Sequence, residues 1–206
     1  RRLLYVSSRA AAAIPDLLVA SRDESNEVRA YALLVLGGTD SDDPEVQRAA
    51  RSGLFDPDPK VRAAAAVCLV RFKHPPEELL PALCDGMRQR GHQVAISSVG
   101  AIMDLGPAAE SIVPVMRELA LDTEHPDEAG VVYALGKVGP VGVPVLIEVL
   151  ERGTTSCRTD AAYALGEMGE AARPAFPALR RAAKDPDQGL SGAANRALRR
   201  LGAEVG

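Results

Sequence analysis

Six segments of this chain share one pattern of apolar and polar positions. They begin at Val28, Val61, Val94, Asp127, Cys157 and Leu190, so the period is 33 residues with one interval of 30. Eight residues after each start stands a leucine or an isoleucine. A repeat with a period in this range indicates a stacked array of similar units rather than one globular core.

Each segment predicts one amphipathic helix. Its apolar residues stand at offsets 4, 7, 8 and 11 from the segment start, a spacing that places them on one face of an α-helix. We therefore expect helices near residues 28–38, 61–72, 94–105, 127–138, 157–168 and 190–201. These are the second helices of six two-helix repeats.

Glycines recur at two fixed offsets of these second helices. At offset 12 they predict a left-handed residue that ends the helix, and they are Gly106, Gly139, Gly169 and Gly202. At offset 9 they lie inside the helix and predict close approach by a neighbouring helix. These are Gly37, Gly136 and Gly166.

A motif of apolar-Pro-x-apolar precedes most segments and predicts the first helix of each repeat. Its prolines are Pro15, Pro81, Pro114, Pro144 and Pro177, whereas Arg48 stands at the equivalent position of one copy. We expect these prolines in first helical turns, where the missing N–H group would have no partner anyway. Two Asp-Pro pairs, at residues 43–44 and 58–59, predict helix N-caps.

The two ends of the array are predicted to differ. Leu3, Leu4 and Val6 fit offsets 8, 9 and 11 of a preceding second helix, so we expect the chain to enter the array within a repeat. In the last copy, Asn195 and Arg199 replace apolar or small residues at offsets 5 and 9. This change is typical of a cap that no further repeat covers.

Three stretches carry a resemblance to a known family. They run from Val28-Arg29 to Gly37, from Val61-Arg62 to Phe72, and from Cys157 to Gly169. They resemble HEAT repeats, in particular the short HEAT-like repeats of phycobilisome lyases, whereas the ankyrin and tetratricopeptide signatures are absent. The resemblance implies an all-α fold, a right-handed α-solenoid of six stacked repeats over residues 1–206, with the second helices along its concave side.

Offsets 3, 6 and 10 form the stripe opposite the buried face of each second helix, and a binding partner is expected there. Tyr and Arg on such a stripe combine apolar area with a polar handle, as residues that dominate binding interfaces do. The alternative is that the tyrosines merely pack along the next helix. The candidate partner-binding residues are Tyr31, Leu34, Val67, Arg71, Asp104, Tyr133, Lys137, Tyr163, Glu167, Arg196 and Arg200.

Composition and chemistry narrow the classes of function. A net charge of −4 and the absence of Trp argue against nucleic acid as the partner. The three histidines and three cysteines form no recognisable metal or nucleophile motif, so no cofactor, no metal and no catalytic residue is expected.

The stretch 131–150 contains Lys137 and several helix breakers, so it predicts two short helices and no membrane span. Unpaired cysteines favour a reducing compartment, and a cytoplasmic location is expected.

The function expected from these observations is a non-catalytic scaffold or adaptor that binds a protein or peptide, acting as a monomer or as part of a longer chain. Two alternatives stay open. The resemblance to lyase repeats allows a subunit that handles a bilin or another prosthetic group. It also allows a protein that binds nucleic acid, as HEAT-like glycosylases do.

Overall fold

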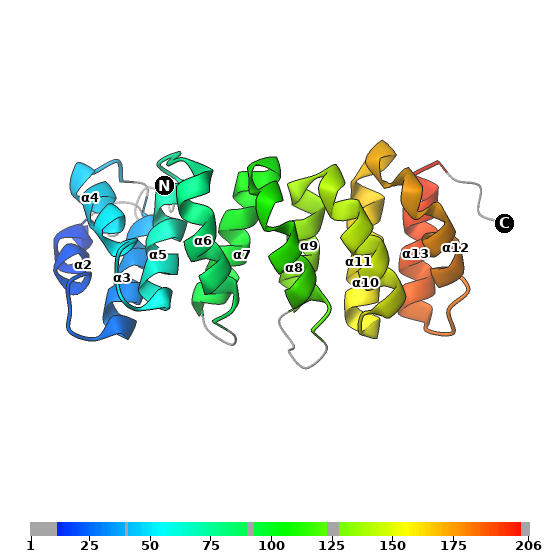
Figure 1. Cartoon of the computed structure of the whole chain (residues 1–206), viewed down its shortest axis with the longest axis horizontal. Helices are drawn as coiled ribbons and strands as arrows, with labels where there is room; N and C mark the ends of the chain where they lie inside the picture. Colours follow the sequence, from blue (N-terminus) through cyan, green and yellow to red (C-terminus); the bar gives the residue numbers. More distant parts are fainter. Residues whose placement is uncertain (1–11, 40, 90–92, 123–127, 203–206) are drawn as a thin grey trace. The chain divides into compact units, whose positions relative to one another are not determined.

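The computed structural model of the chain describes residues 12–39, 41–89, 93–122 and 128–202, without the side chains of residues 128 and 129. These residues form helices joined by turns and contain no strand (Figure 1). The all-α prediction is therefore confirmed. The chain divides into two compact units, Arg1–Asp104 (unit 1) and Leu105–Gly206 (unit 2). The prediction of one continuous body over residues 1–206 stays a prediction.

In its described part, unit 1 consists of three helix pairs. The first helices are α2 (Ile14–Ala20), α4 (Pro44–Gly53) and α6 (Pro76–Met87). The second helices are α3 (Asn26–Gly37), α5 (Pro59–Val70) and α7 (Gln93–Leu105), of which α7 ends one residue beyond the unit. Helix α5 packs against α3, α4 and α6 (Figure 1). Helices α3 and α5 thus each contact both their own first helix and the next repeat.

Unit 2 repeats this arrangement with short 3-10 helices added. The first helices are α8 (Val113–Ala120), α10 (Val143–Arg152) and α12 (Phe176–Ala182). The second helices are α9 (Glu128–Val138), α11 (Thr155–Glu167) and α13 (Gln188–Arg200). The 3-10 helices η1 (Gly106–Ile112), η2 (Pro140–Gly142) and η3 (Gly169–Ala175) precede the first helices. Helix α11 packs against α9 and α13.

The second helices begin and end within two residues of their predicted bounds. Offset 4 and offset 8 are buried in every copy, and the leucines and Ile102 at offset 8 are at most 1% exposed. Val35 is the exception at offset 7, with half of its side chain exposed.

The glycine predictions at both offsets are confirmed. Gly106, Gly139 and the other two offset-12 glycines all have positive φ. At offset 9, a Cβ on Gly37 would lie 2.9 Å from the Cα of Cys68, which is offset 7 of the next copy. Gly136 meets Ala164, and Gly166 meets Ala197, by the same rule. Glycine at offset 9 therefore allows the backbone of one second helix to approach the next.

The prolines of the first helices are predicted correctly in four of five copies. Pro15, Pro114, Pro144 and Pro177 stand at the first or second helical position. The prediction for Pro81 is wrong, because α6 begins at Pro76 and Pro81 lies in its interior. Pro75 is the N-cap and Pro76 the first residue of this helix, so the helix begins five residues before Pro81.

Two further local predictions are confirmed. The carboxylates of Asp43 and Asp58 accept hydrogen bonds from the backbone N–H groups of Glu45 and Lys60, so both residues cap their helices. The interval of 30 residues arises in a connection, since η2 has three residues whereas η1 and η3 have seven. The first helix of this repeat, α10, is no shorter than α8 or α12, so the link absorbs the deletion.

The arginine of the Val-Arg motif, at offset 1, has a structural role. Arg29 makes two hydrogen bonds to the Asp56 carboxylate, both of 2.9 Å, and also donates to the backbone carbonyls of Asp23 and Glu24. Arg62 donates one hydrogen bond to the Asp85 carboxylate, and Arg158 donates one to the Asp185 carboxylate. Arg29 and Arg62 therefore tie the loop before their own helix to an aspartate of a neighbouring first helix or the turn after it, whereas Arg158 ties the Leu150 carbonyl in the last turn of α10 to Asp185. Most of the Arg29 and Asp56 side chains are shielded from solvent.

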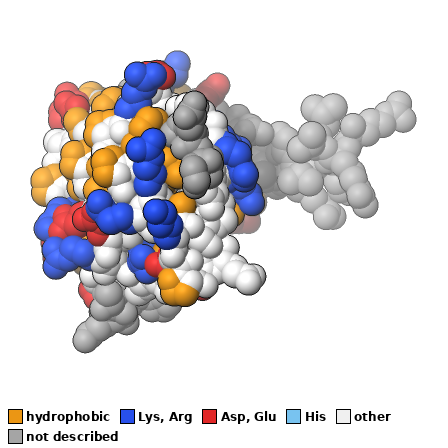
Figure 2. All heavy atoms as spheres, turned by 90° about the vertical axis from the view of Figure 1, so that its right-hand side faces the viewer, with side chains coloured by type: hydrophobic (Ala, Val, Ile, Leu, Met, Phe, Trp, Pro, Cys, Tyr) orange, Lys and Arg blue, Asp and Glu red, His pale blue; other side chains and the backbone are white. Residues whose placement is uncertain are grey.

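The last helix pair is polar on its outer side, as expected of a cap. Asn195 is half-buried and Arg199 is exposed, whereas offset 5 is fully buried in α5, α9 and α11. Figure 2 views this end of the chain and shows Lys and Arg side chains spread over the face.

One helical run within the described residues, Gln93–Ala120, is long and apolar enough to cross a membrane by length and composition alone. It consists of α7, η1 and α8, and Gly106 between α7 and the rest of η1 has a φ of +54°. The run is weak evidence for a membrane span, because its backbone is interrupted at Gly106. Apolar core helices of soluble proteins also pass a test of length and composition. The stretch 131–150 forms α9 and α10, as predicted.

Candidate functional site

The second helices of unit 2 are brought close together by small residues. Gly136 on α9 would place a Cβ 3.3 Å from that of Ala164 on α11. Gly166 on α11 would place one 3.0 Å from the Cα of Ala197 on α13. Because the helices approach so closely, equivalent side chains on successive helices become neighbours.

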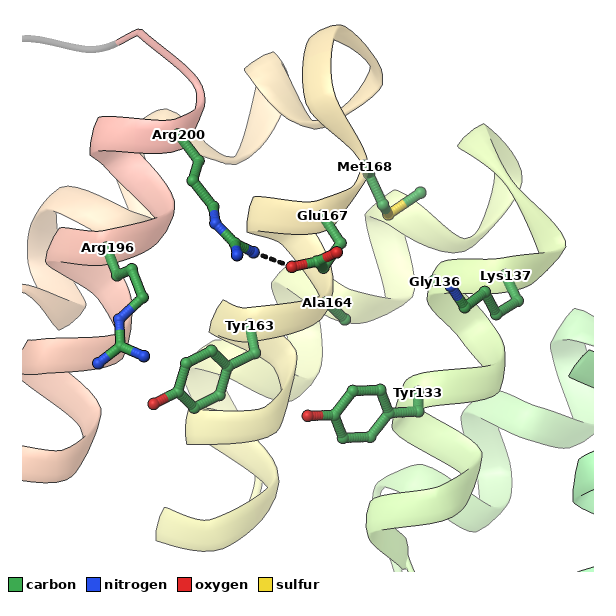
Figure 3. A pocket seen from close by; sticks show the side chains of 9 residues that line it. All are labelled: Tyr133, Gly136, Lys137, Tyr163, Ala164, Glu167, Met168, Arg196 and Arg200. Atoms are coloured by element: carbon green, nitrogen blue, oxygen red, sulfur yellow. Dashed lines mark ion pairs between the residues drawn. The ribbon is translucent and has the colours of Figure 1, made fainter.

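The row at offset 6 consists of two aromatic rings and one guanidinium group. Tyr133 on α9 and Tyr163 on α11 extend in the same direction, and Arg196 on α13 lies beyond Tyr163 (Figure 3). The Cζ atom of Arg196 is 5.3 Å from the centre of the Tyr163 ring, within the range of a cation–π contact. Tyr133 is 41% exposed, so much of its ring is available to a ligand.

The row at offset 10 is formed by charged residues. Lys137, Glu167 and Arg200 occupy it on α9, α11 and α13, and all three side chains are exposed. Arg200 forms an ion pair with Glu167 (Figure 3). The carboxylate in the middle of the row is therefore already partly neutralised.

The two rows enclose a pocket of about 320 Å³. Six of its lining residues belong to the predicted stripe: Tyr133, Lys137, Tyr163, Glu167, Arg196 and Arg200. The remaining lining residues are Gly136, Ala164 and Met168. These three were predicted to be packing residues at offsets 9, 7 and 11, and periodicity alone gives no signal that they would also form the floor of a pocket.

Asp160 stands one helical turn before Tyr163, at offset 3 of α11. Burial raises the pKa of its carboxyl group. Among the other residues at offset 3, Ala64 and Ala193 are at most 1% exposed, whereas Tyr31 is 48% exposed. In unit 2, the stripe residues that line the pocket all stand at offsets 6 and 10.

In unit 1 the stripe residues do not form a comparable pocket among the described residues. Tyr31 is 48% exposed on α3, and Leu34, Val67 and Arg71 are half-buried on α3, α5 and the end of α5. Asp104 is exposed near the end of α7. None of the eleven candidate residues is buried. Tyr5, the remaining tyrosine of the chain, lies outside the described residues.

The thiol and imidazole groups lie away from the pocket. Cys68, Cys84 and Cys157 are free and buried, and burial raises the pKa of Cys68 to about 11. The Nε2 atom of His74 lies 2.7 Å from a carboxylate oxygen of Glu78. The described residues contain no group of three or more His, Cys, Asp or Glu that could hold a metal ion. His92 and His125 lie outside these residues.

Two family models match the chain. The model described as HEAT repeats matches residues 14–102, and the model described as PBS lyase HEAT-like repeat matches residues 158–185. Together they cover more than half of the chain; the first match spans α2 to α7, and the second spans most of α11 together with η3 and α12. This chain is a HEAT-like repeat protein.

Solved structures agree with this fold. An engineered protein is 17% identical to this HEAT-like protein, and the alignment covers 92% of this chain and 96% of that chain with a TM-score of 0.54. Human deoxyhypusine hydroxylase in complex with glycerol is 23% identical over 93% of this chain and 85% of that chain, with a TM-score of 0.33.

A third similar structure is the complex of CpcE and CpcF of phycocyanin lyase from Nostoc sp. PCC7120. It is 22% identical, covers 96% of this chain and 78% of that chain, and has a TM-score of 0.43. Because the last two TM-scores are below 0.5, these two alignments add nothing to the fold assignment. No curated protein matches this HEAT-like protein in sequence.

Proposed function

We propose that this HEAT-like protein is a non-catalytic interaction scaffold, and that its partner, a protein or peptide, binds the pocket of unit 2. The observation that carries the proposal is the meeting of six predicted stripe residues from three successive helices around one pocket. Repeat arrays commonly use the aligned second helices to present an extended binding surface.

The chemistry of the pocket suits binding. Tyr133 and Tyr163 offer large rigid rings at a low cost in conformational entropy, together with phenolic groups that can donate or accept hydrogen bonds. Lys137 and Arg196 add cations at the two sides of the pocket. Aromatic rings beside arginine are the combination most enriched among residues that dominate protein interfaces.

Photo-crosslinking in cells of the source organism identifies the partner and tests the surface. Benzoylphenylalanine in place of Tyr133 is expected to capture one protein, to be identified by mass spectrometry. Benzoylphenylalanine in place of Phe55 is the matched control, because Phe55 is an aromatic residue that is 88% exposed and lies outside the stripe. Equal capture of the same protein from both positions contradicts the proposed surface.

The affinity of the purified partner then measures the contribution of the tyrosines. The double substitution Tyr133→Ala and Tyr163→Ala is expected to weaken binding about tenfold or more, if both act as interface anchors. Phe55→Ala is expected to leave the affinity unchanged. An unchanged affinity in the double variant, with its helical circular dichroism intact, would disprove the site.

The same protein preparation distinguishes the two other functions that the sequence allows. A shift in the absorption spectrum of a bilin on mixing would support a lyase-like subunit. A salt-sensitive gel shift with DNA or RNA would support a nucleic-acid-binding protein. Either result without a captured protein partner would replace the scaffold proposal.

A further inference from the structure

The pocket of unit 2 also indicates the chemistry of its partner. We propose that it binds an acidic segment in the polyproline II conformation, with two carboxylate side chains six residues apart and an apolar residue midway between them. This inference rests on the proposed function and specifies which class of peptide the scaffold holds.

The charge of the lining favours an acidic ligand. Lys137, Arg196 and Arg200 supply three positive charges, whereas Glu167 supplies one negative charge and is paired with Arg200. The lining residues thus carry a formal excess of two positive charges, although the whole chain has a net charge of −4. A local charge opposite to that of the rest of the protein steers an oppositely charged partner to this place.

The order of these charges across the three helices sets the order of the ligand's side chains. The flanking helices present cations, Lys137 on α9 and Arg196 on α13. The central helix presents the Tyr163 ring, the half-buried Met168 and a carboxylate that is already paired. A ligand that matches this order has an acidic residue, then an apolar residue, then a second acidic residue.

The spacing of the helices sets the number of residues between these ligand side chains. Packed helices lie about 8–10 Å apart, and the glycine contacts show that α9 is packed directly against α11 and α11 against α13. A polyproline II helix advances about 3.1 Å per residue and returns to the same face every third residue, hence about 9.3 Å. An extended β-strand returns to one face after about 6.6 Å, which does not match. Three residues of polyproline II therefore span one helix spacing and six residues span two.

The aromatic row supports the same conformation. Tyr133 and Tyr163 extend in one direction from neighbouring helices, so their rings form adjacent walls of the pocket (Figure 3). Aromatic-lined grooves bind proline-rich segments, because these segments lose little conformational entropy on binding. Proline or another compact apolar residue between the two acidic positions would pack against these rings.

Single-stranded nucleic acid is less well matched to the pocket than an acidic peptide. Its bases could stack on the tyrosines, but a phosphate follows every nucleotide. A continuous row of phosphates would have to pass the carboxylate of Glu167 on α11. A peptide can place its carboxylates only at the flanking helices.

Fluorescence anisotropy with synthetic peptides tests this inference on the full chain. The probe is a fluorescein-labelled peptide of alanine and proline that contains two glutamates six positions apart. One control has the same composition with the glutamates five positions apart, which turns one carboxylate off the binding face. Two further control peptides have both glutamates replaced by glutamine or by lysine.

We expect the six-position peptide to bind at least about threefold more tightly than the five-position control, since exposed ion pairs contribute modestly to the binding free energy. The glutamine and lysine peptides are expected to bind more weakly still.

Variants of the protein locate the bound peptide. Lys137→Gln and Arg196→Gln are each expected to weaken binding of the six-position peptide about two- to fivefold. Arg199→Gln is the matched control, because Arg199 is exposed on the same helix as Arg196 and does not line the pocket. It is expected to leave the affinity unchanged.

The outcomes separate this inference from the proposed function. Equal binding of the six- and five-position peptides, or equal effects of Arg196→Gln and Arg199→Gln, would overturn the inference. So would tighter binding of a single-stranded oligonucleotide that competes with the peptide. If the six-position peptide does not bind, but binding of the crosslinked partner still depends on Tyr133 and Tyr163, only the proposed peptide chemistry is wrong. If the peptide does not bind and partner binding does not depend on these tyrosines, both proposals are disproved.

Discussion

Gly37 of α3 packs directly on the backbone of Cys68 of α5, so closely that a Cβ at residue 37 would lie 2.9 Å from the Cα atom of Cys68. Real side chains almost never show such a distance, and the contact is with backbone rather than with a movable side chain. This contact between two successive second helices recurs in unit 2 at Gly136 and Gly166.

Gly37→Ala is therefore expected to destabilise unit 1, although alanine is the better helix former. The loss should be about 1–3 kcal/mol, the usual cost of overpacking, and urea denaturation measures it. Gly100→Ala on α7 is the matched control, since nothing lies within 4 Å of a Cβ there. That substitution should stabilise by up to about 1 kcal/mol. The same sign for both variants would contradict close packing at residue 37.

The offset-1 arginine should contribute measurably to stability. Arg29→Met removes two hydrogen bonds to a mostly buried carboxylate, so we expect a loss of about 1.5–3 kcal/mol in the free energy of unfolding. A double-mutant cycle with Asp56→Asn isolates the coupling between the two side chains. Arg48→Met is the control, because the pair of Arg48 with Glu45 is solvent-exposed and should matter little. A coupling energy near zero would disprove the role of Arg29.

The same pair predicts a dependence of stability on pH. Burial alone would raise the pKa of Asp56, but hydrogen bonds from Arg29 and from the backbone N–H of Asp58 outweigh it and lower this pKa. A carboxyl group whose pKa is lowered by folding stabilises the protein above its unfolded pKa of about 3.9, and this contribution is lost as the pH falls through the folded pKa. The stability difference between the wild type and Arg29→Met should therefore be largest near pH 7 and shrink below about pH 4. A difference that grows toward acid would contradict the assignment.

Lys73 occupies a position where glycine would be better. It has a φ of +52° at offset 12 of its repeat, where four other copies have glycine with positive φ. A residue with a Cβ raises the free energy of the folded state by about 1–2 kcal/mol when its backbone is in the left-handed region. Lys73→Gly is expected to raise the midpoint of thermal unfolding, with a gain of about 0.5–1 kcal/mol after the entropy cost of glycine in the unfolded chain. A lower midpoint would show that the Lys73 side chain has a stabilising contact that outweighs this strain.

The periodic pattern predicted the second helices well, because the burial of one helix face imposes a phase on the sequence. Leu69 and its equivalents mark that face, and the glycines mark where backbones meet or turn. The first helices were predicted less well. In α6 the start depends on Pro75-Pro76 rather than on the repeated Pro81, and the 3-10 helices of unit 2 leave no periodic signal.

The candidate site was predictable in its parts but not as a pocket. Offsets 6 and 10 are exposed or half-exposed as the helical phase requires, and this brought Tyr133, Tyr163 and Arg196 into one row. Whether such a row encloses space depends on how closely neighbouring helices approach. That distance is set by tertiary contacts such as Gly166 with Ala197, and the pattern of a single helix cannot give it.

The most direct test of the binding surface is an NMR titration of the labelled protein with its crosslinked partner or with the six-position acidic peptide. Backbone and side-chain shifts are expected to change at Tyr133, Tyr163 and Arg196, on the second helices of unit 2. Residues on the outer first helices, such as Arg180 on α12, should keep their shifts. Shift changes confined to the first helices, with Tyr133 and Tyr163 unaffected, would contradict the account.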